Sequence, residues 1–136
     1  IYLKSIRSVL LQCPGAIHSL AHITGGGITE NLNRALPSTL DAEIQVGSWN
    51  MVPILPWVCR AAHLNETEAL KTFNMGLGMI LAVAPQKAEE VAQLLADAGE
   101  EVYIVGQVVP GVGKVVYLDE EELFAAYSED EEAEED

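Results

Sequence analysis

The run His-Ile-Thr-Gly-Gly-Gly at residues 22–27 holds the residue types best suited to chemistry in this chain. An apolar, β-prone segment over residues 17–23 leads into the glycines, and a helical pattern starts at residue 28. Glycine allows positive φ and lacks the Cβ that blocks a ligand, so such a turn can bring backbone N–H groups close to an anion. By itself the pattern fits a phosphate-binding turn and a tight turn that binds nothing about equally well.

His22 is the candidate catalytic residue, because it ends the expected strand two residues before the glycine run begins at Thr24-Gly25. A histidine can donate a proton to an oxyanion or form a hydrogen bond with it near neutral pH. The alternative is a histidine whose hydrogen bonds are satisfied inside the core.

A second candidate segment covers residues 73–78, where two glycines stand at alternate positions after an asparagine. This spacing suits a close backbone approach, but taken alone it favours a helix C-terminal cap followed by a strand with glycine faces. Trp49, which follows Ser48, is predicted to fill the core or an interface. The candidate phosphate-binding residues of the glycine turn are Thr24, Gly25, Gly26 and Gly27.

The cysteines and histidines do not have the spacing of metal ligands. Cys13 and Cys59 lie in apolar helical patterns, so we expect a reduced pair of small buried side chains, with a disulfide as the alternative. His18 and His22 would lie about 13 Å apart on one strand, too far to share an ion. We therefore predict no metal site in this chain.

The net charge of −14 is concentrated at the end of the 136-residue chain. Residues 119–136 contain eleven acids and no Lys or Arg, whereas residues 1–118 carry ten acids against seven bases. We expect a globular domain over residues 1–118, followed by an acidic tail that is disordered over residues 128–136. No segment of the chain is basic enough to favour nucleic-acid binding. With no signal peptide and no apolar run of about 18–20 residues, we expect a cytoplasmic protein without a membrane segment.

Hydrophobic periodicity predicts helices and strands in a mixed order, which is typical of an α/β (α+β) layer structure with a mixed sheet. The expected helices cover residues 2–13, 28–36, 54–63, 66–72 and 85–99, and the expected strands cover 17–24, 42–47, 79–84, 101–109 and 114–118. The strand at 17–24 is expected to be buried on both faces. Residues 110–113 are expected to join the last two strands as an antiparallel hairpin, and residues 119–127 could extend as a frayed helix.

These segments together resemble one enzyme family, the phosphoribosylformylglycinamidine cyclo-ligases, also called aminoimidazole ribonucleotide synthetases. The similarity covers residues 1–118 and the C-terminal half of that family. It is carried by IYLKS (1–5), AHITGGGITENLNRALP (21–37), GSW (47–49), TFNMGLGM (72–79) and, more weakly, AGEEVYIVGQVV (98–109). For the fold, the resemblance implies an α/β sandwich that is partly ferredoxin-like.

For function, the resemblance implies ATP-dependent ring closure of formylglycinamidine ribonucleotide to aminoimidazole ribonucleotide, with release of ADP and phosphate. It places His22 near the activated amide oxygen. It also implies substrate- and phosphate-binding residues in both glycine segments: donors to a phosphate from Thr24, Gly25, Gly26 and Gly27, and a neighbouring wall formed by Asn74, Gly76 and Gly78. ATP and Mg²⁺ would be held mainly by an N-terminal half, which also forms the family's homodimer. That half is absent here, so we expect this chain alone to be inactive. The alternative is a non-catalytic module that binds a nucleotide or a phosphorylated metabolite.

Overall fold

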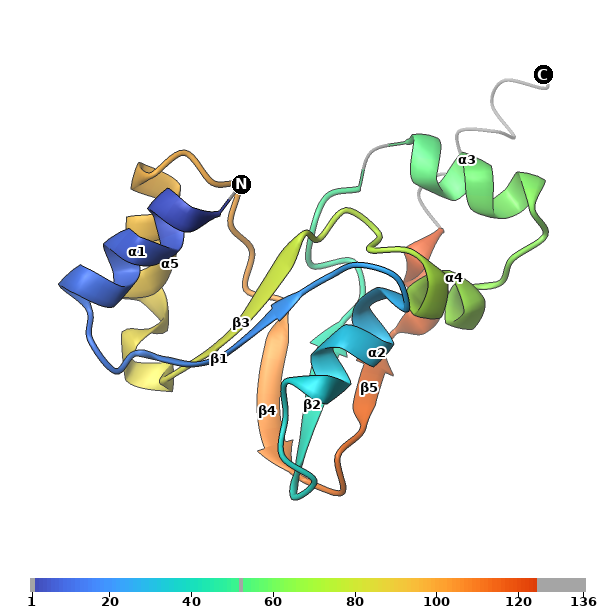
Figure 1. Cartoon of the computed structure of the whole chain (residues 1–136). Coiled ribbons are helices and arrows are strands. Elements are labelled where there is room, and N and C mark those ends of the chain that lie inside the picture. Colours follow the sequence, from blue (N-terminus) through green and yellow to red (C-terminus); the bar gives the residue numbers. More distant parts are fainter. Residues whose placement is uncertain (1, 52, 125–136) are drawn as a thin grey trace.

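The computed structural model describes residues 2–51 and 53–124, and its elements confirm an α/β fold with a mixed sheet (Figure 1). The helices are α1 (Leu3–Gln12), α2 (Gly27–Arg34), α3 (Ile54–Ala61), α4 (Glu66–Thr72) and α5 (Ala88–Asp97), with short 3₁₀ turns η1 (Pro85–Lys87) and η2 (Glu120–Leu123). The strands are β1 (Ile17–His22), β2 (Leu40–Gln45), β3 (Met79–Val83), β4 (Gly106–Pro110) and β5 (Val115–Leu118).

A two-stranded antiparallel ribbon, β1 with β3, runs through the middle of the molecule (Figure 1). Its register pairs His22 with Met79, so the end of β1 lies beside the start of β3. Helices α1 and α5 lie side by side at one end of this ribbon and share a small apolar cluster with it. The ribbon therefore connects this helical pair to the rest of the domain.

The mixed sheet has the strand order β4-β2-β5, with β4 antiparallel and β5 parallel to the central strand β2. Helix α2 covers one face through the main apolar core, in which Ile28 and Leu32 meet Ala42 and Ile44. A hydrogen bond of 2.7 Å between the hydroxyls of Thr29 and Tyr117 also joins α2 to β5. Burial raises the pKa of Tyr117 to about 12, so this hydroxyl keeps its proton across the physiological pH range.

The expected hairpin of the last two strands is wrong, because β4 and β5 lie on opposite sides of β2. The four residues 111–114 between these strands can cross two strand spacings, about 10 Å, without strain. The crossing is held by Asp41 of β2, whose carboxylate accepts hydrogen bonds of 2.8 Å from the backbone amides of Val112 and Lys114. Residues 101–105, which were expected to belong to a strand, precede the first paired residue of β4.

The expectation that residues 17–24 are buried on both faces is also wrong. His18, Leu20 and His22 of β1 are exposed, whereas Ala21 is buried. A two-stranded ribbon has no further strands to cover it, and the helical pair covers only part of its second face. The exposed side chains are therefore those that point away from the main core.

Several helix ends form where the sequence predicts them. Asn65 caps α4 through a capping box, in which its side chain accepts from the amide of Glu68 and its own amide donates to the Glu68 carboxylate. Gly99 follows α5 with a φ of 94°, the left-handed conformation typical of a residue that ends a helix. Helix α3 begins directly after Pro53, as predicted.

The packed part of the chain continues past residue 118. Leu123 and Phe124 are 5% and 8% exposed and belong to the main core, next to the 3₁₀ turn η2. The expected disorder of residues 128–136 lies outside the described residues. Among residues 2–51 and 53–124, no helix has the length and apolar character needed to cross a membrane.

The Asp41 carboxylate provides a test of the strand crossing. Hydrogen bonds from the backbone amides of Lys114 and Val112 lower its pKa below the ordinary 3.8. Asp41 thus stabilises the fold above pH 3.8, and this contribution is lost as the pH falls through its lower folded-state pKa. We expect Asp41→Asn to lower the urea midpoint at pH 7, with a smaller difference from wild type at pH 3. Asp97→Asn, on the exposed end of α5, is the control; an equal effect of both variants would contradict the assignment.

Candidate phosphate-binding turn and catalytic histidine

The glycine turn lies between the end of β1 and the start of α2, as the sequence predicts. Gly26 and Gly27 adopt positive φ values of 94° and 64°, which L-residues with a side chain rarely adopt. Thr24 and Gly25 are exposed. The Gly27 amide donates to the carbonyl oxygen of Thr24 at 3.0 Å, so it is used inside the turn. Within the described part of the chain, the amides of Gly25 and Gly26 donate to no other group.

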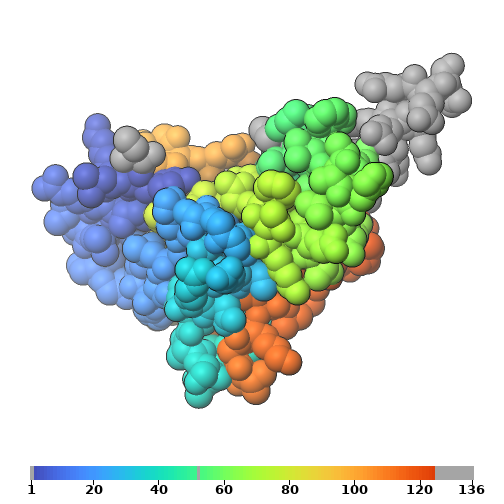
Figure 2. Space-filling view, turned by 45° about the vertical axis from the view of Figure 1, so that its right-hand side comes forward, coloured from blue at the N-terminus to red at the C-terminus, as the bar shows by residue number. Residues whose placement is uncertain are grey.

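Gly27 has a packing reason to be glycine. A Cβ at this position would lie 2.4 Å from the carbonyl oxygen of Leu70 and 2.7 Å from that of Phe73, at the end of α4. Backbone atoms cannot move aside as the end of a flexible side chain can, so only glycine fits. Figure 2 shows the resulting contact, with α2 and α4 side by side on the face turned to the viewer.

Both ends of the second glycine segment, residues 73–78, contact the glycine turn or the residue that leads into it. The Ile23 amide donates to the carbonyl oxygen of Gly78 at 2.9 Å, and Phe73 lies against Gly27. The structure thus places Asn74, Gly76 and Gly78 on a segment that borders the glycine turn. This arrangement agrees with the sequence expectation that the two segments line one region.

The second segment folds as a tight turn around Met75 and Gly76, whose φ values are 52° and 97°. Asn74 closes it twice, because its side chain accepts from the Gly76 amide and its carbonyl oxygen accepts from the Leu77 amide. Trp49 fixes the turn from the core, since its buried Nε1 donates to the Met75 carbonyl oxygen at 2.9 Å. The prediction that Trp49 is a core residue is therefore confirmed.

His22 is exposed at the end of β1 and lies next to Tyr2, with the ring centroids 6.4 Å apart in an edge-on arrangement. The alternative of a histidine held in the core is therefore excluded. Tyr2 also covers Gly78: a Cβ built on Gly78 would overlap the tyrosine hydroxyl. The group that lies close to the Gly78 backbone is thus the side chain of Tyr2.

Asn31 is the residue that the sequence analysis missed. It is 8% exposed, and its Nδ2 lies 3.2, 3.1 and 2.8 Å from the carbonyl oxygens of Thr24, Gly25 and Gly27. Its Oδ1 accepts a hydrogen bond of 3.4 Å from the Thr24 hydroxyl. The available signal was an asparagine on the apolar face of the helix, four residues after the last glycine.

The charges near the turn are mixed. A Cβ on Gly26 would lie 2.1 Å from Oε2 of Glu30, so this carboxylate reaches back over the turn. Glu30 pairs with Arg34 at 2.6 Å, and the two side chains are 60% and 62% exposed, so the pair is weak and free to rearrange. An anion at the Gly26 amide would require this carboxylate to swing away or a cation to offset its charge.

The two cysteines are free and buried in different apolar clusters, Cys13 near α5 and Cys59 in the main core. Burial raises the pKa of both thiols, which suits inert core residues. The expectation of a reduced pair is therefore confirmed. In the described ranges, no three His, Cys, Asp or Glu side chains gather in a way that could hold a metal ion.

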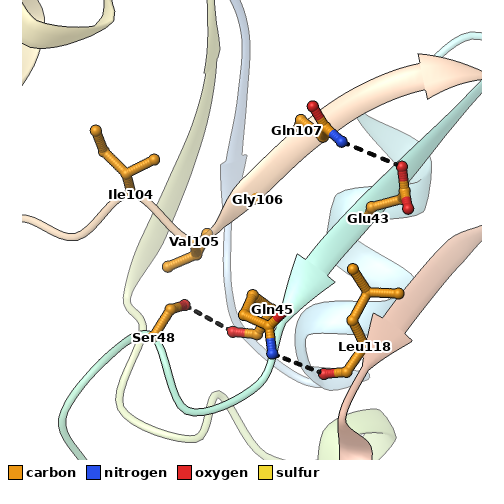
Figure 3. A pocket seen from close by; sticks show the side chains of 8 residues that line it. All are labelled: Glu43, Gln45, Ser48, Ile104, Val105, Gly106, Gln107 and Leu118. Carbon is orange, nitrogen blue, oxygen red and sulfur yellow. Dashed lines mark hydrogen bonds between the residues drawn. The ribbon is translucent and has the colours of Figure 1, made fainter.

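A hollow of about 330 Å³ lies away from these residues, on one face of the mixed sheet (Figure 3). Glu43 and Gln45 line it because they alternate with the buried residues of β2 and so point to the face opposite α2. Its wall contains one carboxylate and neither Lys nor Arg, and it includes none of the predicted site residues. The lining chemistry does not suit a phosphate.

The fold and the turn together define an α/β domain that presents a strand–glycine–helix junction. Residues 2–119 match the family described as AIR synthase related protein, C-terminal domain, and the chain belongs to this family. This finding confirms the resemblance stated from the sequence.

The names of similar curated proteins are consistent with this family. The chain is 44% identical over 117 residues to the phosphoribosylformylglycinamidine cyclo-ligase of Brevibacillus brevis. This aligned stretch covers 86% of this chain and 33% of the relative. It is 43% identical over 113 residues to the cyclo-ligase of Geobacillus kaustophilus, covering 83% and 32%. It is 45% identical over 95 residues to the bifunctional purine biosynthetic protein purD of Dictyostelium discoideum, covering 70% and 12%. The chain thus spans about a third of the length of these cyclo-ligases.

Alanine substitutions distinguish Gly27, which packs against a backbone, from Gly25, which has open space around it. Gly27→Ala adds a methyl group against the backbone of α4 at a positive φ, and we expect it to lower the free energy of unfolding by at least about 2 kcal/mol. The Cβ added by Gly25→Ala has no atom within 4 Å, so this variant should change the free energy of unfolding by less than about 0.5 kcal/mol. Urea unfolding of the 136-residue chain measures both, and equal effects would contradict the close approach.

Proposed function

We propose that this chain is the C-terminal part of a phosphoribosylformylglycinamidine cyclo-ligase. The reaction converts formylglycinamidine ribonucleotide and ATP to aminoimidazole ribonucleotide, ADP and phosphate. The observation that carries the proposal is the junction at residues 22–27, where an exposed histidine stands beside a turn with two unused backbone amides. The relatives named as this enzyme, at 43–44% identity over most of the chain, support the same reaction.

The turn supplies hydrogen-bond donors to the phosphate of the ribonucleotide. The amides of Gly25 and Gly26 are the donors that this chain offers. The Thr24 hydroxyl can donate to the phosphate only by giving up the hydrogen bond of 3.4 Å that it donates to Asn31 Oδ1. Gly27 and Gly78 contribute by shape, because the first packs against α4 and the second is covered by Tyr2. Asn74 and Gly76 form the neighbouring wall, whose tight turn is held from the core by Trp49.

His22 acts on the reacting amide. Its exposed ring lies at the same end of β1 as the turn, so a ribonucleotide bound there by its phosphate can reach it. A protonated imidazole can donate a hydrogen bond to the oxygen on which negative charge develops, and a neutral one can accept the proton released on ring closure. In either role, the ring favours the transition state over the ground state.

ATP and Mg²⁺ belong mainly to the N-terminal half of the enzyme. Residues 2–51 and 53–124 offer no metal site of their own, because no three candidate side chains among them converge. The Glu30 carboxylate over the turn also opposes an anion, so a bound phosphate requires this carboxylate to turn away or a cation from elsewhere to offset its charge. We therefore propose that the N-terminal half completes the site and forms the homodimer, and that this chain alone is inactive.

Reconstitution tests the proposal. ATP-dependent formation of aminoimidazole ribonucleotide is expected when the chain is present together with its N-terminal half, and not with either part alone. Turnover by the isolated chain would contradict the division of the site. If the joined halves bound the ribonucleotide without closing the ring, a non-catalytic binding module would replace the proposed enzyme.

His22→Ala tests the catalytic residue in the two-part enzyme. We expect a loss of turnover of about a hundredfold or more, which is the usual range for removing an acid–base group or an oxyanion donor. His18→Ala, at an exposed position of the same strand, is the matched control and should stay near wild type. A change of less than about threefold for His22→Ala would show that the residue has no chemical role.

A further inference from the structure

The side chain of Asn31 holds the glycine turn through its peptide groups. Nδ2 lies within 3.2 Å of the carbonyl oxygens of Thr24, Gly25 and Gly27, which is an unusual concentration of acceptors around one amide. Only the NH₂ end of the side chain can donate to carbonyl groups, so these contacts fix its orientation. The hydroxyl of Thr24 then donates to the Oδ1 end.

Two of these carbonyls belong to the peptide groups that carry the unused amides. In a planar trans peptide, the C=O and the following N–H point in opposite directions. The Thr24 carbonyl shares its peptide group with the Gly25 amide, and the Gly25 carbonyl shares its group with the Gly26 amide. Because Asn31 draws both carbonyls inward, both N–H groups face away from it.

Without such a fixed contact, the turn has other conformations available. Glycine populates positive and negative φ almost equally, so the peptide group between Gly25 and Gly26 can reverse at low cost. The peptide group between Thr24 and Gly25 has a second restraint, because its carbonyl oxygen also accepts from the Gly27 amide at 3.0 Å. Reversal would turn the N–H groups towards the core and the carbonyl oxygens outwards, where they would repel an anion. Asn31 is 8% exposed, so water competes little for its hydrogen bonds.

We propose that Asn31 is the positioning residue of the phosphate-binding turn, and that it sets the direction of the Gly25 and Gly26 amides. This inference rests on the proposed function, because it assigns those amides to the phosphate of the ribonucleotide. Asn31 touches no substrate itself. It acts through two peptide groups, and it also orients the Thr24 hydroxyl.

Asn31→Asp is the sharpest variant, because it keeps the shape and replaces the donor by an acceptor. A carboxylate facing these carbonyls should drive the peptide groups to reverse. In the two-part enzyme, we expect KM for formylglycinamidine ribonucleotide to rise about tenfold to a hundredfold, with kcat changed less than about threefold. Asn33→Asp makes the same chemical change at an exposed position of α2 and should leave KM unchanged.

Stability must be measured beside the kinetics, because a buried substitution can also weaken the fold. KM is compared at a temperature where urea unfolding shows each variant to be folded. If Asn31→Asp does not fold, Asn31→Ala replaces it, since alanine removes the donor without adding a charge. A folded variant with wild-type KM would overturn the inference.

Backbone NMR of the two-part protein separates this inference from the proposed function. Titration with formylglycinamidine ribonucleotide should shift the ¹H–¹⁵N signals of Gly25 and Gly26 in wild type and leave them nearly unshifted in Asn31→Asp. No shift in wild type would reject the turn as the phosphate site, and the inference would fall with it. Equal shifts in both proteins would overturn the role of Asn31 while leaving the phosphate site in place.

Discussion

The contact between Gly27 and the backbone at the end of α4 is the constraint on which the candidate site depends. It brings the start of α2 within van der Waals distance of the segment that leads to Asn74. The ladder of β1 with β3 fixes the other end of the same segment, through the bond from Ile23 to Gly78. Two turns that lie about fifty residues apart in sequence are thereby held next to each other.

The electrostatics of this region support the proposal that the domain needs a partner for catalysis. Backbone amides and one hydroxyl can orient a phosphate, but they carry no net charge. The nearest charged side chain over the turn is the carboxylate of Glu30, which is only weakly paired with Arg34. In the proposed enzyme the domain would therefore supply orientation, and a bound phosphate would require Glu30 to turn away or a cation from the N-terminal half to offset its charge.

The sequence was sufficient for features that depend on neighbouring residues. The cap at Asn65, the helix end at Gly99 and the strand–turn–helix junction at residues 22–27 follow from local patterns, and the structure has all three. The strand order β4-β2-β5 could not be found in this way, because it depends on pairing across more than sixty residues. The role of Asn31 was also hidden, since its side chain bends back from the helix to hold the preceding turn.

The central claim is that the turn at residues 24–26 binds the phosphate of the ribonucleotide through amides that face outwards. A crystal structure of this chain joined to its N-terminal half, with formylglycinamidine ribonucleotide bound, tests it most directly. The account predicts phosphate oxygens about 2.7–3.2 Å from the Gly25 and Gly26 nitrogens, with Glu30 turned away. A phosphate bound elsewhere, with the Glu30 carboxylate still over Gly26, would contradict it.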